Sequence, residues 1–315
     1  MTSMSIDRIE ELAARFQVET IRDGRDRLDL RYGVYYRGTG EPRRYVLFLN
    51  GRTEWLEKYV YLPEDLGLPA DTAFVSWDHR GQGGSGGARA YVDSYDSYAE
   101  DASRIVQRVV GDKPYVALSH SMGGLIALYA TLTGRLKPEA LVLSSPLLGL
   151  PNAPVPRSVA RPLARLLTLC QLGTVSSGAG SFDTIPFEKN ALTHDGDLYA
   201  RMQRSPYKLP GATFGWVAAS FKALDTCFSP ASLQRLTTPT LVLGGSKDTV
   251  VDLAALPAWV QKASRFAKVD VQLCMVPGAR HELLSETRDY YDVALAAIRG
   301  WLASFLKDER ADATR

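Results

Sequence analysis

The chain has 315 residues, which is enough for one large domain or for one domain that carries an insertion. Apolar residues make up 45% of the chain and charged residues 23%, so the composition excludes a disordered chain, a collagen-like chain and a disulfide-stapled miniprotein. The formal net charge is only +2, which argues against a nucleic-acid partner bound through a broad basic surface.

The chain begins with a predicted helix over residues 6–16, whose apolar residues recur at helical spacing. Residues 28–37 alternate between apolar and polar and predict a strand. Short runs that are almost wholly apolar follow, and such runs are typical of strands buried on both faces of a parallel sheet. These runs are Tyr45–Leu49, Ala73–Trp77, Tyr115–Leu118, Leu141–Leu143, Leu241–Leu243 and Val269–Val276.

Helical patterns lie between most of these runs. One covers residues 95–109, another begins at Met122 and reaches about Thr133, and the last covers residues 291–305. Ser285 is the predicted N-cap of the last helix. Strands that alternate with helices predict an α/β fold with a doubly wound, mostly parallel sheet.

The alternation is interrupted between about residues 150 and 236. This stretch is too long for a simple connection between two strands. We therefore expect residues 1–150 and 237–315 to form the core of the fold, and residues 151–236 to form an inserted helical cap, or lid.

The strongest local signal is the segment Ser119-His120-Ser121-Met122-Gly123, which has a predicted strand before it and a predicted helix after it. It resembles the G-x-S-x-G turn, which presents a nucleophilic serine between a strand and a helix. The turn crowds the positions two residues either side of the nucleophile, and Ser119 and Gly123 are both small. We therefore predict Ser121 as a nucleophile; a chance serine in a small-residue turn is the alternative.

A serine nucleophile needs a base, and the chain has four histidines. His120 adjoins Ser121 and is expected to point away from it. His79 precedes the serine in the chain, and His194 falls among polar residues of the predicted cap. His281 follows the last predicted strand, and catalytic groups of this architecture lie in loops at the carboxyl ends of strands. His281 is therefore the predicted base.

The base needs an acid to orient it, and two aspartates follow the run Leu241–Leu243. Asp248 lies on the loop directly after that run, whereas Asp252 lies further on, where it would cap the next helix. We favour Asp248. The chain order Ser121, Asp248, His281 is then the order of α/β-hydrolase triads.

A developing oxyanion needs two backbone donors. The residue after the nucleophile supplies one, which makes the Met122 N–H the first predicted donor. The second donor comes from a loop after an early strand, and the Arg52 N–H is the candidate there.

The segment 81–86 matches the G-x-G-x-x-G pattern of dinucleotide sites. Polar residues separate it from the preceding strand and no helical pattern begins there, so we interpret it as a structural turn. Asp78 and Arg80 are then expected to fix loops near the nucleophile.

Two features of the predicted cap bear on its partners. Arg157, Arg161 and Arg165 form a row at helical spacing, either a solvated basic face or a contact with an anionic membrane surface or a phosphate. The cap also contains more large apolar side chains than a surface loop needs. They would either pack the cap onto the sheet or line an acyl-chain channel that leads to Ser121. These side chains belong to Leu166, Leu167, Leu169, Leu172, Phe182, Phe187, Phe214, Trp216 and Phe221.

Taken together, the motifs resemble the branch of the α/β-hydrolase family that contains monoacylglycerol lipases and bacterial lysophospholipases. The resemblance covers about residues 28–307. The segment beginning Asn50-Gly51-Arg52 is similar to the Pro-Gly-Arg form of the bacterial lysophospholipases, and Asn50 replaces the histidine of the monoacylglycerol lipases. The motifs in order are Asn50-Gly51-Arg52-Thr53-Glu54-Trp55, Asp78-His79-Arg80-Gly81-Gln82-Gly83-Gly84-Ser85, Ser119-His120-Ser121-Met122-Gly123-Gly124, Gly245-Ser246-Lys247-Asp248 and Gly278-Ala279-Arg280-His281-Glu282.

The resemblance and the predicted triad imply a serine carboxylic-ester hydrolase that forms an acyl-enzyme with monoacyl lipid esters and uses no cofactor or metal. An aminopeptidase on short peptides is one alternative; it would need a carboxylate in the cap, for which Asp195, Asp197 and Glu188 are available. A non-catalytic ligand receptor on the same fold is another.

The cysteines and the lack of long apolar runs bear on the cellular location of the protein. Cys170, Cys227 and Cys274 are far apart and odd in number, which is typical of reduced thiols in a cytoplasmic protein and excludes a C-x-x-C zinc site. The first residues contain no apolar core of signal-peptide length, and the chain has no run of apolar residues long enough to span a membrane. We expect a cytoplasmic protein, with peripheral contact to the inner membrane as an option.

Overall fold

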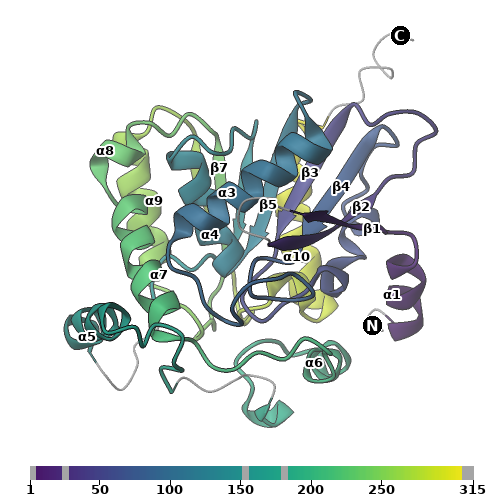
Figure 1. Ribbon diagram of the computed structural model, residues 1–315. Coiled ribbons are helices and arrows are strands. Elements are labelled where there is room, and N and C mark those ends of the chain that lie inside the picture. Colours follow the sequence, from purple (N-terminus) through teal and green to yellow (C-terminus); the bar gives the residue numbers. More distant parts are fainter. Residues whose placement is uncertain (1–4, 23–27, 151–155, 179–183, 307–315) are drawn as a thin grey trace.

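The computed structural model describes residues 5–22, 28–150, 156–178 and 184–306. Within these residues, one eight-stranded sheet has the order β1-β2-β4-β3-β5-β6-β7-β8 (Figure 1). The strands are β1 (Gln17–Arg22), β2 (Asp29–Tyr35), β3 (Arg44–Leu49), β4 (Thr72–Trp77), β5 (Tyr115–His120), β6 (Leu141–Ser144), β7 (Thr240–Gly245) and β8 (Val271–Val276).

The sheet is mostly parallel, as the apolar runs predict. β3 to β8 pair in parallel, and β2 pairs antiparallel with both β1 and β4. All residues of β4, β5, β6 and β7 are buried, because helices cover both faces. The expected α/β fold is confirmed. The edge strand β1 was not predicted, since its side chains are nearly all exposed and carry no apolar alternation.

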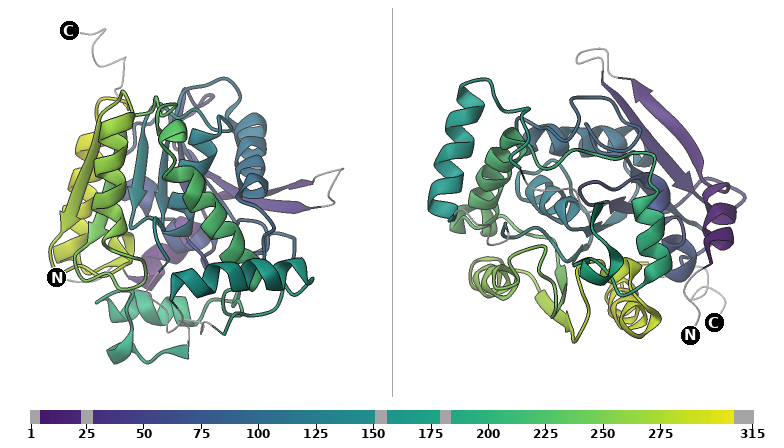
Figure 2. Two further views of the ribbon diagram at one scale, coloured as in Figure 1. Left: turned by 90° about the vertical axis from the view of Figure 1, so that its left-hand side faces the viewer. Right: turned by 90° about the horizontal axis from the view of Figure 1, so that it is seen from below.

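Helices form a layer on each face of the sheet (Figure 2). Core residues of α3, α4, α7 and α9 pack against one face, and those of α1, α2 and α10 pack against the other. The helices are α1 (Ile6–Ala13), α2 (Leu62–Asp65), α3 (Tyr95–Ile105), α4 (Met122–Leu132), α5 (Arg157–Leu169), α6 (Gly196–Gln203), α7 (Phe214–Cys227), α8 (Pro230–Leu233), α9 (Ala255–Phe266) and α10 (Arg288–Leu302). Short 3-10 turns cover Leu56–Tyr59, Phe187–Lys189 and Leu283–Ser285.

Several helix boundaries differ from the prediction. The helix expected over residues 6–16 ends at Ala13. The helix expected over residues 95–109 ends at Ile105 and continues as a π-helical turn, Val106–Val110. Ser285 does not cap the last helix, which begins at Arg288 after Thr287. Ser285 instead ends a 3-10 turn, and its hydroxyl shares a hydrogen bond with the Tyr61 hydroxyl, so the serine is used in packing.

The segment between β6 and β7 holds α5, α6, α7 and α8. In Figure 1 α5 and α6 lie below the sheet, whereas α7 runs up beside α4 and α9 and contributes Trp216 to the core. Residues 151–155 at the start of the predicted cap, and Phe182 within it, lie outside the described residues. No helix in the described ranges is both long enough and apolar enough to cross a membrane.

Candidate active site

Ser121 lies on a sharp turn between β5 and α4. Its φ of 52° and ψ of −117° are backbone angles that residues other than glycine rarely adopt. A Cβ at Gly123 would lie 2.1 Å from the Leu49 carbonyl oxygen and 2.4 Å from that of Asn50. Only glycine therefore lets the loop after β3 approach the first turn of α4. This is the strained turn that the sequence predicts for a nucleophile.

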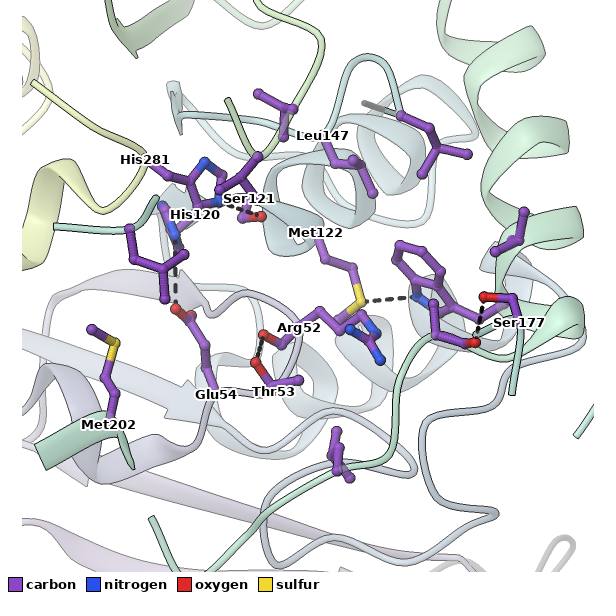
Figure 3. A pocket seen from close by; sticks show the side chains of 18 of the residues that line it. Arg52, Thr53, Glu54, His120, Ser121, Met122, Leu147, Ser177, Met202 and His281 are labelled. Carbon is purple, nitrogen blue, oxygen red and sulfur yellow. Dashed lines mark hydrogen bonds and ion pairs between the residues drawn. The ribbon is translucent and has the colours of Figure 1, made fainter. Parts of the chain in front are cut away.

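The structure brings the three predicted triad residues together. His281 Nε2 lies 3.0 Å from Ser121 Oγ (Figure 3). His281 Nδ1 lies 2.7 Å from Asp248 Oδ2. Asp248 and His281 are only 4% and 3% exposed, so the contact between them is shielded from water. The distances are those of a nucleophile, a base and an orienting acid.

The second aspartate has a different environment. Asp252 pairs with Arg157 at 2.7 Å and accepts a hydrogen bond from the Ala254 N–H, just before α9. Asp248, in contrast, also accepts hydrogen bonds from the N–H groups of Val250 and Val251. These donors fix the Asp248 carboxylate, whose other oxygen contacts the histidine.

Burial and charge oppose each other in the triad. Burial acts to raise the pKa of Asp248, but the charge and hydrogen bond of His281, with two backbone donors, lower it overall. Burial acts to lower the pKa of His281, but Asp248, Glu282 and Glu54 raise it overall. The arrangement therefore stabilises an imidazolium at His281 beside an ionised Asp248.

Both predicted oxyanion donors lie in the same cavity as Ser121. Their neighbours are used elsewhere: the Gly51 N–H donates to Glu54, and the Thr53 N–H donates to Gln82 Oε1 at 2.7 Å. Within the described chain, the N–H groups of Arg52 and Met122 donate to no protein acceptor. They are thus available to a bound ligand.

Gln82 connects the loop after β3 with the start of α4. Its Oε1 accepts from the Thr53 N–H, and its Nε2 donates to Met122 Sδ at 3.3 Å. Gln82 belongs to the glycine-rich segment that resembles a dinucleotide motif, and it is 2% exposed. Sequence reasoning treated the segment as a turn and missed this contact.

The same turn is held by the two charged residues expected to fix loops. Asp78 Oδ2 lies 2.9 Å from Arg31 and accepts from the Gly84 N–H, and Asp78 Oδ1 accepts from the Leu56 N–H. Arg80 forms a two-pronged ion pair with Asp101. No helix begins here, so the segment lacks the helix N-terminus that binds a pyrophosphate.

A buried charged cluster beside the triad was not predicted. Lys58 Nζ lies 2.5 Å from Glu54 Oε1 and 2.7 Å from Glu282 Oε2, and the Tyr59 hydroxyl donates to both carboxylates. The imidazole of His120 lies against this cluster, with its centroid 4.8 Å from that of His281. The spacing of four residues between Glu54 and Lys58 was the available signal, but nothing in the sequence places Glu282 beside this pair.

The cluster contains a set of atoms that could in principle hold a metal ion. Glu54, His120 and Glu282 bring ligand atoms within 4.8 Å of one another. However, the Lys58 ammonium already contacts both carboxylates and occupies the position that a cation would take. The donor set therefore does not fit a metal.

The remaining histidines lie away from the nucleophile. His194 Nδ1 lies 2.8 Å from Glu286 Oε1, and His79 Nε2 contacts the Asn50 carbonyl oxygen at 3.1 Å. Burial lowers the pKa of His79 to about 4. Within the described residues, His281 is the histidine that contacts Ser121 Oγ.

Ser121 opens into a cavity of about 590 Å³, a size typical of small-molecule sites. Much of its wall is apolar and comes from the segment between β6 and β7. Lining residues from that segment include Leu163, Ala164, Leu192, Tyr199, Met202, Leu209, Phe214, Trp216 and Phe221.

A family model described as "Serine aminopeptidase, S33" matches residues 40–288. The chain belongs to this family. A monoacylglycerol lipase of Mycolicibacterium smegmatis is 28% identical over 84% of this chain and 90% of its own length. A probable lysophospholipase L2 of Haemophilus influenzae is 27% identical, over 84% of this chain and 85% of that protein.

Solved structures share the fold. A soluble variant of monoglyceride lipase from Saccharomyces cerevisiae superposes with a TM-score of 0.75 at 21% identity, over 93% of this chain and 96% of that one. The family, the relatives and this neighbour confirm the α/β-hydrolase family that the motifs resemble, and they support the class of carboxylic-ester hydrolases.

Proposed function

We propose that this chain is a serine carboxylic-ester hydrolase that acts through an acyl-enzyme on monoacyl lipid esters. The observation that carries the proposal is the unbroken chain of contacts from Ser121 Oγ through the His281 ring to Asp248, at 3.0 and 2.7 Å. The positive φ of Ser121 adds support, because such a turn presents the hydroxyl of a nucleophile.

The proposed reaction has two stages. Ser121 Oγ attacks the ester carbonyl while His281 Nε2 takes the hydroxyl proton, and the N–H groups of Arg52 and Met122 hold the oxyanion. The C–O bond to the alcohol then breaks, and His281 gives the proton to the departing alcohol. Water next attacks the acyl-enzyme, with His281 again as base, which releases the fatty acid and restores Ser121. Asp248 stays ionised and orients the ring, and no cofactor enters these steps.

Monoacyl lipid esters are favoured as substrates for two reasons. The relatives include proteins named monoacylglycerol lipase and probable lysophospholipase. The cavity over Ser121 has a largely apolar wall, which suits an acyl chain. Since each buried methylene adds about 0.8 kcal/mol at most, kcat/KM is expected to rise with acyl length until the cavity is full.

The aminopeptidase alternative has less support, although the family carries that description. An aminopeptidase needs a carboxylate to hold the substrate ammonium, and the described carboxylates that line the cavity are Glu54 and Glu282, both paired with Lys58. Of the cap candidates, Asp195 caps α6 through its side chain and lies outside this cavity. Glu188 and Asp197 do not line it either.

Covalent labelling tests the proposal. A fluorophosphonate is expected to label the wild type and to leave Ser121→Ala unlabelled. A panel of monoacylglycerols, lysophospholipids and aminoacyl-arylamides then separates the alternatives. Hydrolysis of the arylamides but not of the esters would favour the aminopeptidase, and ligand binding without labelling or turnover would favour a receptor.

We also propose that the cap makes peripheral contact with a membrane surface, through the apolar face of α5. Two arginines of the expected basic row are already paired, Arg157 with Asp252 and Arg161 with Asp225. The apolar side chains of this segment are exposed instead, 57% for Leu166 and 72% for Leu169.

The cysteines are free, in keeping with a cytoplasmic location.

A further inference from the structure

The side chain of Arg52 has no role in the proposed mechanism, which uses only its backbone N–H. The guanidinium lines the cavity beside Met122 (Figure 3). Its Cζ lies 5.3 Å from the centre of the Trp216 ring, and its Nη2 donates to the Pro210 carbonyl oxygen at 2.9 Å. Its Nε is buried without an acceptor. Within the described residues, no carboxylate pairs with it.

Arg52 differs in this respect from two other cations of the same cavity wall. Lys58 contacts the carboxylates of Glu54 and Glu282, and Arg157 contacts Asp252. Burial lowers the pKa of Arg52, and no carboxylate counteracts this effect. A guanidinium in such surroundings lacks a counter-ion. An anion with two oxygens in the plane of the guanidinium would be a suitable counter-ion.

The position of Arg52 restricts where that anion could be on a substrate. The backbone N–H of the same residue is a predicted oxyanion donor, so the guanidinium lies one side-chain length from the ester carbonyl. Trp216 limits the movement of the guanidinium. The indole N–H donates to Met122 Sδ at 3.2 Å, which fixes the indole, and the Arg52 guanidinium lies over the indole ring in a cation–π contact. The anion must therefore be joined to the ester by a short linker, as in the alcohol part of a glycerol phosphate ester.

Building on the proposed ester hydrolysis, we infer that Arg52 is a specificity-determining residue that binds the phosphate of a monoacyl glycerophosphate ester. The planar guanidinium offers paired N–H donors that match two phosphate oxygens, which an ammonium would not do. The apolar wall takes the acyl chain, and the glycerol places the phosphate beside Arg52. The neutral monoacylglycerol lacks this contact and is the poorer substrate.

The test compares two esters that differ only in the phosphate. We would measure kcat/KM for 1-lauroylglycerol 3-phosphate and for 1-lauroylglycerol in micelles of a neutral detergent, and take their ratio. The ratio cancels any effect of a substitution on the oxyanion hole. It is expected to favour the phosphate ester in the wild type and to fall by about 10- to 100-fold in Arg52→Met, as for the loss of a charge-assisted contact.

Arg157→Met is the matched control, because Arg157 lines the same cavity but is already paired with Asp252. Its ratio is expected to equal that of the wild type. Arg52→Gln provides a second replacement if Arg52→Met does not fold. Equal ratios in the wild type and the Arg52 variants, or an equal fall in Arg157→Met, would overturn the inference and leave ester hydrolysis intact.

Binding separates this inference from the proposed function. The ether analogues 1-O-dodecylglycerol 3-phosphate and 1-O-dodecylglycerol cannot be hydrolysed, and calorimetry gives their affinities. The phosphate analogue is expected to bind more tightly to the wild type, and Arg52→Met is expected to lose that difference. If neither ester is hydrolysed but this difference is found, the proposed function fails and the inference stands. If the analogues bind equally to the wild type, the inference fails.

Discussion

The ammonium of Lys58 lies 2.7 Å from the carboxylate of Glu282, the residue that follows the predicted base His281. Lys58 also contacts Glu54, whose carboxylate accepts the Gly51 N–H. One buried cation thus joins the loop of the predicted oxyanion donor to the loop of the predicted base. Because Lys58 is 2% exposed, these contacts are largely protected from solvent and salt.

Removal of that cation should destabilise the fold. Lys58→Met would leave two buried carboxylates without their counter-ion, and the free energy of unfolding is expected to fall by about 3–5 kcal/mol. Urea denaturation followed by circular dichroism measures this. Lys268→Met, at an exposed site, is the control and should change stability by less than about 0.5 kcal/mol. A Lys58 variant as stable as the control would show that the cluster does not stabilise the fold.

The triad prediction rests on three side chains with separate roles. In Ser121→Ala, kcat for ester hydrolysis should fall by about 10⁶-fold, as in a comparable triad, and the variant should remain folded. In Asp248→Asn, kcat should fall by about 10⁴-fold, because the amide favours the wrong tautomer of His281. Asp252→Asn is the matched control, since Asp252 contacts Arg157 instead. Greater damage from Asp252→Asn than from Asp248→Asn would reverse the assignment of the acid.

The parts of this site that the sequence predicts are those with a local signature. The apolar run of β5 and the small residues of the turn identify Ser121, and the position of loops after β7 and β8 identifies Asp248 and His281. Each of these predictions rests on residues that are adjacent in the chain. Each also rests on the rule that the carboxyl ends of parallel strands meet at one edge of the sheet.

The parts that the sequence misses depend on contacts between distant residues. Lys58 and Glu282 are 224 positions apart, and Gln82 reaches Met122 across 40 positions. No periodicity or motif reports such pairings. The pairing of Arg161 with Asp225 is of the same kind, and it is why the arginine row looked like a free basic face.

The pH dependence should reflect the surroundings of His281. The histidine must be neutral to act as a base, and its pKa is raised, because Asp248, Glu282 and Glu54 together outweigh the effect of burial. The acid limb of kcat/KM for a neutral ester should therefore have its midpoint above the ordinary histidine value of about 6.5.

Glu282→Gln tests the cause of that shift. Loss of the negative charge removes one of the groups that raise the pKa of His281, so the midpoint should move to lower pH. Asp252→Asn, which removes a carboxylate paired with Arg157, should leave the midpoint in place. A rate that stays flat from about pH 8 to pH 5 would contradict a histidine base altogether.

The approach of the loop after β3 to α4 depends on Gly123. In Gly123→Ala the new Cβ would clash with backbone oxygens of Leu49 and Asn50, which cannot rotate away. Stability should fall by about 1–3 kcal/mol, and kcat/KM by about 10²-fold as the oxyanion donors move. Gly300→Ala is the control, because no atom lies within 4 Å of a Cβ added at this position on α10. It should stabilise the helix by about 0.5–1 kcal/mol. Thermal unfolding and ester assays distinguish the two variants, and normal activity in Gly123→Ala would mean that the loop adapts.

The proposed membrane contact depends on apolar side chains of α5, not on its arginines. The double variant Leu166→Ser/Leu169→Ser should bind vesicles at least about tenfold more weakly, since both side chains are exposed and would enter the lipid surface. Replacement of Arg157, Arg161 and Arg165 by Gln should change binding little, because the first two already have carboxylate partners. Co-sedimentation with phosphatidylcholine vesicles, with and without phosphatidylglycerol, measures both effects. Loss of binding in the arginine variant, on the anionic vesicles alone, would assign the contact to the basic row. Unchanged binding in the leucine variant would remove the apolar face of α5 as a docking surface.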